Sequence, residues 1–355
     1  MNTTTVAADL AKDVFELAYS DGSGRIIERK RVNRKLFRTL FDNCAPLRIV
    51  MEACGSAHYW GRRFQRAGHT VTLLPAHDVL PYVRRNKTDR TDAAGLLEAD
   101  RCGQIKAVPI KTPEQQSVQG MHRIREQYKA MRTACINALR GLLREFGIVI
   151  PEGSLRVRPA VLAALEDGDN ELSMGFRHSL AGLLEQVEAA EKAIAGIELE
   201  LQAFLDRDLR SQRFQRACGV GLITATALSA SIGDFDRFPS GRHFASSIGL
   251  APREHSSGRT RRLGRISKQG DVYLRTLLIH GARSALAAAK AARNKGKAVD
   301  KLRTWALDLA ERVGHNKAAV ALANKLARRL WAAEHHRKDF DPNHMSQKPK
   351  TATAA

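Results

Sequence analysis

The first hundred residues alternate short apolar strands with helical segments, and this order constrains the fold more than any other feature of the chain. An apolar run at residues 5–12 contains one acid, Asp9, and residues 14–19 continue as a second strand. The sequence Asp-Gly-Ser-Gly at 21–24 is typical of a tight hairpin turn into residues 25–32. We therefore expect three antiparallel strands at the start of the fold.

Helices and strands then alternate. A helical segment over residues 33–43 precedes the apolar strand 47–53, and a helix over 57–67 precedes the strand 70–74. A last helix begins within the stretch 86–97. Antiparallel strands followed by alternating helices and parallel strands predict an α/β fold, a mixed sheet of the ribonuclease H type.

Four acidic residues fall on these elements. Asp9 lies within the first strand, Glu52 ends the fourth, and Asp89 and Asp92 are three residues apart on the last helix, so both project from one face. A carboxylate in an apolar strand is costly to bury unless it is paired or binds a metal. Structural roles stay open, because acids also favour a helix N-terminus. Acids converging from three elements nevertheless favour a Mg²⁺ or Mn²⁺ site for phosphodiester chemistry.

The composition favours a nucleic-acid partner. The 355 residues include 58 Lys and Arg but only 37 Asp and Glu, which gives a formal net charge of +21. The hydrophobic share of 43% indicates a globular chain. An anionic membrane surface is the second choice. The start lacks the pattern of a signal peptide and no apolar run is long enough to span a membrane, so we expect a cytoplasmic protein. Five scattered cysteines indicate neither a disulfide framework nor a zinc site.

Residues 113–210 carry two apolar seams joined by an insert over about 151–175. The second seam extends from Leu180 to Phe204. The first seam contains Met121, Ile124, Tyr128, Met131, Cys135, Ala138 and Leu142. Seams with spacings of three and four residues predict an antiparallel helical hairpin or a coiled coil, which usually serves oligomerisation or spacing.

Residues 211–340 are expected to form a mostly helical domain, followed by a disordered tail at 341–355. Gly219 and Gly221 bracket a turn with the form of a helix-hairpin-helix, whose backbone N–H groups bind phosphate. A basic loop over 249–271 has glycines and small hydroxyls that permit close backbone approach. Its predicted nucleic-acid contacts are Arg253, Arg259, Arg261, Arg262, Arg265 and Lys268.

Four motifs together resemble one known family. They are DLAK with Asp9, MEACGSAHYW with Glu52, KTDRTDAAGL with Asp89 and Asp92, and the long stretch from GLAPREHSSG to HGARSAL. They resemble the DEDD insertion-sequence transposases of the IS110 family, most closely the IS1111 branch. The similarity covers about residues 5–335, and the last motif is long enough to be highly specific.

The resemblance implies three domains: a RuvC-like catalytic domain at 1–112, a coiled-coil or helical hairpin region at 113–210, and a C-terminal transposase domain at 211–340. It also implies that a serine in the basic loop is the nucleophile. That serine maps onto Ser257, although the adjacent Ser256 leaves the register open by one residue, and Ser267 is a distant third candidate. The implied catalytic metal ligands, for Mg²⁺ or Mn²⁺, are Asp9, Glu52, Asp89 and Asp92.

For activity, the resemblance implies excision and site-specific insertion of a DNA element. A structured noncoding guide RNA would pair with donor and target double-stranded DNA, and the protein would act as a homo-oligomer, a dimer or tetramer. Two other functions stay open: a RuvC-like, metal-dependent junction nuclease that hydrolyses with water, and a non-catalytic nucleic-acid-binding protein whose acids are structural. A covalent protein–DNA adduct distinguishes the first function from these two.

Overall fold

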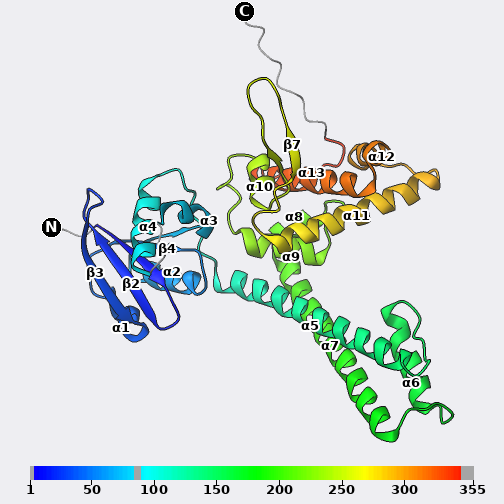
Figure 1. The fold of residues 1–355 in the computed structure, drawn as a ribbon. Coiled ribbons are helices and arrows are strands. Elements are labelled where there is room, and N and C mark those ends of the chain that lie inside the picture. Colours follow the sequence, from blue (N-terminus) through cyan, green and yellow to red (C-terminus); the bar gives the residue numbers. More distant parts are fainter. Residues whose placement is uncertain (1–3, 84–88, 345–355) are drawn as a thin grey trace, which may run out of the picture. The chain divides into compact units, whose positions relative to one another are not determined.

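A computed structural model describes residues 4–83 and 89–344 of the chain (Figure 1). Two compact units make it up. The first contains residues 1–116 and 232–239, and the second contains 117–231 and 240–355. In the described ranges, no helix has both the length and the apolar character needed to cross a membrane.

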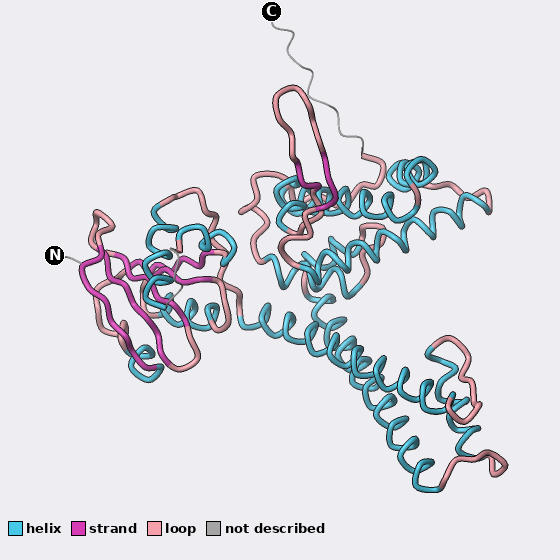
Figure 2. The backbone as a smooth tube through the Cα atoms, viewed as in Figure 1, coloured by secondary structure: helices cyan, strands magenta, loops and turns pink. Residues whose placement is uncertain are grey.

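A five-stranded mixed sheet forms the centre of the first unit, with strand order β3-β2-β1-β4-β5 (Figure 2). Its strands are β1 (Thr5–Leu10), β2 (Val14–Ser20), β3 (Ile26–Asn33), β4 (Arg48–Glu52) and β5 (Thr70–Leu74). Strand β2 pairs antiparallel with β1 and β3, whereas β4 pairs parallel with β1 and β5. This confirms the mixed α/β sheet that the sequence predicts, and the strand order fits the ribonuclease H type.

The two faces of the sheet have different cores. Because side chains alternate along a strand, Val6 and Ala8 of β1 pack into an aromatic core with Phe37 and Trp60, while Ala7 faces the opposite side. The helices α1 (Arg34–Thr39) and α2 (Ala57–Arg66) supply the aromatic core, and α4 (Asp89–Arg101) covers the other face. The short helices α3 (Ala76–Val79) and η1 (Leu80–Tyr82) lead toward α4.

Two long helices, α5 (Pro113–Arg144) and α7 (Met174–Arg207), pack side by side (Figure 1). Two ion pairs join them: Arg125 with Glu198, at 2.6 Å, and Arg132 with Glu191, at 3.6 Å. The later arginine on α5 thus pairs with the earlier glutamate on α7. The helices therefore run antiparallel within one chain. The insert between them contains η2 (Ser154–Arg156) and α6 (Val157–Glu166), and α6 shares a core with both helices.

The apolar seam predicted on α5 is only partly right, because Met121 and Cys135 pack against buried cores but other members are exposed. Ile124, Met131 and Leu142 are 51%, 43% and 41% exposed. The buried residues of α5 are instead Val118, His122, Ile136, Leu139 and Leu143. The register differs because Arg125 and Arg132 face α7 through their ion pairs, which leaves an apolar stripe on the outside. Whether the helices supercoil stays a prediction.

The rest of the second unit is helical apart from one hairpin. Its helices are α8 (Leu209–Gln215), α9 (Leu222–Ile232), α10 (Gly241–Ser247), α11 (Val272–Asn294), α12 (Lys301–Val313) and α13 (His315–His335). Strands β6 (Pro252–Glu254) and β7 (Leu263–Ile266) pair antiparallel. Arg329 on α13 donates hydrogen bonds to the carbonyl groups of Asp341, Pro342 and His344, so the chain packs on this helix as far as residue 344. Residues 345–355 of the predicted tail lie outside the described residues.

Gly219 and Gly281 bring two backbone segments into direct contact. A Cβ atom at Gly219 would lie 2.3 Å from the carbonyl oxygen of Gly281, and one at Gly281 would lie 1.9 Å from that of Gly219. No side chain fits in this space. The turn before α9 therefore packs against α11 only because both positions are glycine.

We predict that Gly281→Ala lowers the free energy of unfolding by about 1–3 kcal/mol, because the methyl group forces the two backbones apart. Gly196→Ala is the matched control: Gly196 lies on the exposed side of α7, where a Cβ meets no atom within 4 Å. That variant should gain up to about 1 kcal/mol from helix propensity. Urea unfolding measures both, and equal stability of the two variants would contradict this packing.

Candidate active site

Three of the four predicted acids line one small cavity of about 30 Å³. Asp9 lies near the end of β1, Glu52 ends β4, and Asp92 lies in the first turn of α4. The parallel register pairs Ala8 with Met51, so the next residues along the two strands are Asp9 and Glu52. The sheet therefore places these two carboxylates at the same level on neighbouring strands.

The pleat of the strands directs both carboxylates to the α4 side. Asp9 shares its face with Ala7, and Glu52 shares its face with Val50. Ala7 and Val50 belong to the core beneath α4, together with Leu96. Asp92 lies one helical turn before Leu96, so α4 brings it to the same place from above.

Asp92 brings an unsatisfied carboxylate oxygen into the cavity. Its Oδ1 atom is buried and has no hydrogen-bond partner within the part of the chain that is described. A buried carboxylate oxygen without a partner costs free energy, and a bound cation would remove that cost. Carboxylate oxygens are also the ligands that Mg²⁺ and Mn²⁺ prefer. The residues present therefore fit a divalent ion.

The four-acid site stays a prediction. Asp89 begins α4, but its side chain lies outside the described part of the structure, as do residues 86–88 of the stretch in which the sequence predicts the start of a helix. Among the described side chains, no three His, Cys, Asp or Glu form a group that could hold a metal by themselves. The three described acids thus share a cavity without already forming a closed coordination shell.

Cys54 lies beside the acids, and the sequence motifs gave no functional role to it. Burial, together with the negative charges of Glu52 and Asp9, raises the pKa of the Cys54 thiol to about 11. The thiol is therefore neutral near pH 7 and is a poor nucleophile.

The predicted serines lie on an exposed hairpin formed by β6 and β7. Ser257 and Thr260 exchange backbone hydrogen bonds of 3.2 and 3.1 Å, and Gly258 takes a left-handed φ of 56° between them. This tight turn follows from the glycine, since few other residues adopt such a φ without strain. The turn holds Ser257 near the tip of the hairpin and in contact with solvent.

The two adjacent serines have different surroundings. The Ser256 hydroxyl donates to Glu254 at 2.7 Å and accepts from the backbone N–H of Arg262 at 3.2 Å, so it braces the hairpin. That hydrogen bond, with the charge of Arg261, holds the pKa of the Glu254 carboxyl below its usual value, which makes it a weak base. The Ser257 hydroxyl has no hydrogen bond within residues 4–83 and 89–344, and it stays available for other contacts.

The predicted cations crowd the same hairpin. Arg261 pairs with Glu254 at 3.3 Å, and Arg253 donates to the carbonyl of Ser267 at 3.3 Å, which places Ser267 at the base. Arg259, Arg262, Arg265 and Lys268 are exposed and form no ion pair in the described chain. The hairpin therefore presents mostly uncompensated positive charge, which suits a polyanion.

Gly219 and Gly221 differ in their environments. The close contact with Gly281 explains by itself why position 219 is glycine. A Cβ at Gly221 would meet nothing within 4 Å, so packing gives no reason for that glycine. Phosphate binding by this turn stays a prediction.

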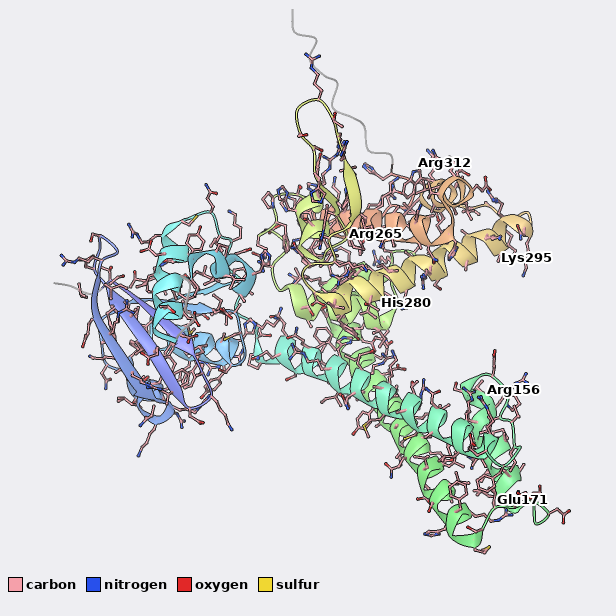
Figure 3. All side chains as sticks on the ribbon, viewed as in Figure 1. Arg156, Glu171, Arg265, His280, Lys295 and Arg312 are labelled. Atoms are coloured by element: carbon pink, nitrogen blue, oxygen red, sulfur yellow. The ribbon has the colours of Figure 1, made fainter. Side chains whose placement is uncertain are left out.

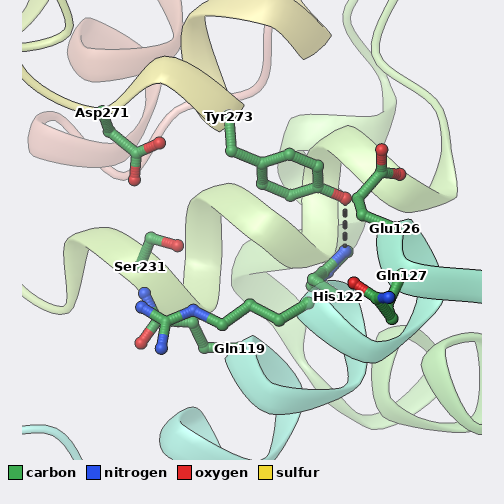
Figure 4. Close-up of a pocket in the computed structure, with 8 residues that line it drawn as sticks. Gln119, His122, Glu126, Gln127, Ser231, Asp271 and Tyr273 are labelled. Carbon is green, nitrogen blue, oxygen red and sulfur yellow. Dashed lines mark hydrogen bonds between the residues drawn. The ribbon is translucent and has the colours of Figure 1, made fainter. Parts of the chain in front are cut away.

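A second cavity, of about 370 Å³, surrounds a buried histidine that the sequence analysis did not select (Figure 4). His122 of α5 lies 3.0 Å from the Tyr273 hydroxyl and 3.0 Å from the Thr226 hydroxyl. Thr226 donates its proton to the carbonyl of Leu222 at 2.8 Å, so it must accept from Nε2–H of His122. Nδ1 then accepts from Tyr273, and the chain of hydrogen bonds joins α5 to α9 and α11 with a neutral histidine.

Low pH should weaken the hydrogen bonds through which His122 joins α5 to α9 and α11. Burial, and secondarily the positive charge of Arg125, lowers the pKa of His122 to about 4, from about 6.5 for an ordinary histidine. Its contribution to folding is full above pH 6.5 and is lost as the pH falls from 6.5 toward 4.

We predict that the free energy of unfolding of wild type falls between pH 7 and pH 5 by about 2 kcal/mol more than that of His122→Gln. Urea unfolding at several pH values measures this difference. The comparison with the variant is needed because His58 also has a pKa of about 4. An identical pH dependence of the two proteins would exclude this role for His122.

Comparison with known proteins places the chain among transposases. Residues 6–148 match the DEDD transposase model of the IS110 type, and residues 211–297 match a model described as the transposase IS116/IS110/IS902 family. The chain is 42% identical to a probable family 20 transposase of Pseudomonas aeruginosa, over 94% of this chain and 97% of that protein.

Two further relatives also align over most of their length. The transposase for insertion sequence element IS1111A of Coxiella burnetii is 41% identical, over 92% of this chain and 88% of that protein. The transposase for IS1328 of Yersinia enterocolitica is 33% identical, over 93% of this chain and 96% of that protein.

Proposed function

Because the chain belongs to the IS116/IS110/IS902 family of insertion-sequence transposases, we propose that it cleaves and rejoins DNA strands with Ser257 as nucleophile. A divalent ion, Mg²⁺ or Mn²⁺, would assist at the acidic edge of the sheet. The observation that carries the proposal is the convergence of Asp9, Glu52 and Asp92 on one cavity.

Asp9, Glu52 and Asp92 would hold the ion, and Asp89 would add a fourth carboxylate from the same face of α4. When bound, a divalent ion stabilises negative charge on phosphoryl oxygens and favours deprotonation of a hydroxyl. The buried Oδ1 of Asp92 supports this assignment, because it lacks a partner within the described residues. The acids themselves orient the ion and keep it at one end of the parallel strands.

Ser257 would lose its proton as its Oγ atom forms a bond to phosphorus. The bond from phosphorus to the leaving strand breaks, which leaves a phosphoserine ester and a free hydroxyl on the DNA. Attack by a hydroxyl of another strand reverses these steps and rejoins the DNA. The free Ser257 hydroxyl supports this choice over Ser256, whose hydroxyl already binds Glu254 and Arg262.

A serine hydroxyl is a weak nucleophile at neutral pH and needs help to lose its proton. His255 is two residues away, but its side chain has no bond to Ser257 in the described hairpin. The proposal therefore requires the hairpin to reach an acidic site, either of the same chain or of a partner subunit. The arginines of the hairpin would then stabilise the charge of the phosphate under attack.

A structured noncoding RNA would select the DNA by pairing with donor and target. Base pairing would then provide sequence specificity, while the protein supplies contacts to phosphate. The net charge of +21 and the unpaired cations of the hairpin support binding of several nucleic-acid strands.

Treatment of the purified complex with ribonuclease should abolish cleavage of the DNA. Full cleavage after that treatment would contradict an RNA guide.

The test of the mechanism is a covalent adduct. With DNA, RNA and Mg²⁺, wild type and Ser256→Ala should form a protein–DNA adduct that survives denaturing electrophoresis. Ser257→Ala and Asp92→Asn should form none, because the first lacks the nucleophile and the second weakens the metal site. If Ser257→Ala formed the adduct and Ser256→Ala did not, the nucleophile would be Ser256. Cleavage by wild type without any adduct would indicate hydrolysis by water.

The exposed stripe of α5 supports a homo-oligomer, since recombination must hold two DNA molecules together. Ile124 and Met131 lie on this stripe at heptad spacing. We predict that Ile124→Glu with Met131→Glu dissociates the protein, whereas Ala195→Glu, on the exposed side of α7, does not. Light scattering measures the mass, and a monomeric wild type, both free and bound to nucleic acid, would exclude an oligomer.

A further inference from the structure

A groove of about 470 Å³ lies beside the base of the serine hairpin and belongs entirely to the second unit. Pro252 and Ile266 of the hairpin line it. Trp305 of α12 also lines it, together with three cations of α13: Lys317, Lys325 and Arg328. The sequence analysis placed nucleic-acid contacts on the hairpin itself and selected none of these cations.

The groove and the hairpin are linked. Asn324 of α13 donates a hydrogen bond to the carbonyl of Leu250, two residues before the first hairpin strand, at 3.0 Å. Asn324 and Leu250 both line the groove. A ligand in the groove would therefore lie at a fixed position relative to the start of the hairpin.

The cations of the groove have no acidic partners in the described chain. Lys325 places its ammonium nitrogen 3.7 Å from the centre of the Trp305 ring, a cation–π contact. Other arginines of the same helical domain are compensated, since Arg293 pairs with Glu311 and Arg303 pairs with Asp300. The groove cations thus differ from these paired arginines, because their charge is not neutralised by an acid of the described chain.

These cations are held together against their own repulsion. Burial, followed by the charges of Arg329 and Arg328, lowers the pKa of Lys325. Burial and then Arg242 lower the pKa of Arg328. Close backbone packing brings Arg242 near Arg328. A Cβ at the preceding residue, Gly241, would lie only 2.7 Å from the carbonyl oxygen of Arg328. Such a cluster is costly in the free protein, and a bound anion would offset the cost.

We propose that this groove binds the phosphodiester backbone of a nucleic-acid strand next to the serine hairpin, through Lys325 and Arg328 with Lys317 at its rim. This assignment rests on the proposed function, which supplies the strand. Two cations three residues apart on one helix, in a groove also lined by a tryptophan, suit neighbouring phosphates of a strand. DNA and RNA share this chemistry, and the experiment below distinguishes them.

The test uses full-length protein with Lys325→Gln and Arg328→Gln combined. The control combines Lys295→Gln and Arg312→Gln, which remove the same charge from exposed positions. Figure 3 shows Lys295 and Arg312 well separated from Arg265 of the hairpin. Fluorescence anisotropy would measure binding to single-stranded DNA, duplex DNA and single-stranded RNA of one length over a range of salt concentrations.

For the strand that occupies the groove, the double variant should reduce the slope of log affinity against log salt by about 1.4 on a single strand or about 1.8 on a duplex. Affinity should fall roughly tenfold or more, while the control stays close to wild type. A reduced slope and affinity on DNA alone or on RNA alone would identify which nucleic acid occupies the groove. A reduction on both would show that the groove accepts either. Slopes equal to those of the control on all three probes would overturn the proposal.

A charge-preserving variant separates binding from folding. Lys325→Arg combined with Arg328→Lys should retain the wild-type salt slope. If its slope and affinity fall as far as those of the Gln double variant, the cause is damaged packing and the proposal fails. The readout is binding, so it is independent of the adduct. Absence of the adduct in wild type with the expected salt slopes would contradict the serine mechanism but not the groove.

Discussion

The parallel pairing of β1 with β4 is the interaction on which the candidate active site depends. Backbone hydrogen bonds between these strands set Ala8 against Met51, and this register brings Asp9 and Glu52 to one level. A shift by one residue would turn one carboxylate to the aromatic side of the sheet, away from α4. Because both faces are buried, the two cores fix the register, and the position of the acids follows from packing.

Charge is the second organising feature. Acids of the first unit share a cavity, with one buried oxygen that has no partner in the described chain. In the second unit, unpaired cations occupy both the serine hairpin and the groove at its base. Both arrangements cost free energy in the free protein and both are relieved by a ligand of opposite charge. Our proposals assign a divalent cation to the first arrangement and polyanionic strands to the second, which together suit phosphodiester chemistry.

Local patterns predicted the first unit well. Alternation and turn residues located every strand up to Leu74. The common face of Asp9 and Glu52 needed the strand register, which the structure supplied. Asp9 and Glu52 could be recognised as candidate site residues because an acid within or at the end of a short apolar strand stands out in the local sequence. The placement of Ser257 at a turn likewise follows from Gly258 and its neighbours.

Long-range contacts account for what the sequence did not predict. Helix α5 has two apolar stripes, and contacts with distant residues, among them the ion pairs to Glu191 and Glu198 on α7, decide which stripe turns outward. The contacts of His122 with Thr226 and Tyr273 span 104 and 151 residues, so no local pattern contains them. The groove cations are similar, because on α13 alone Lys325 and Arg328 resemble an ordinary solvated helix face.

The central claim is that Asp9, Glu52 and Asp92 together bind a divalent ion. Anomalous scattering from crystals grown with Mn²⁺ tests it most directly. The account predicts a Mn²⁺ peak in contact with the carboxylates of all three residues in wild type, and no peak there in Asp92→Asn. An active wild-type protein whose crystals show Mn²⁺ elsewhere, with this cavity empty at saturating Mn²⁺, would contradict the account.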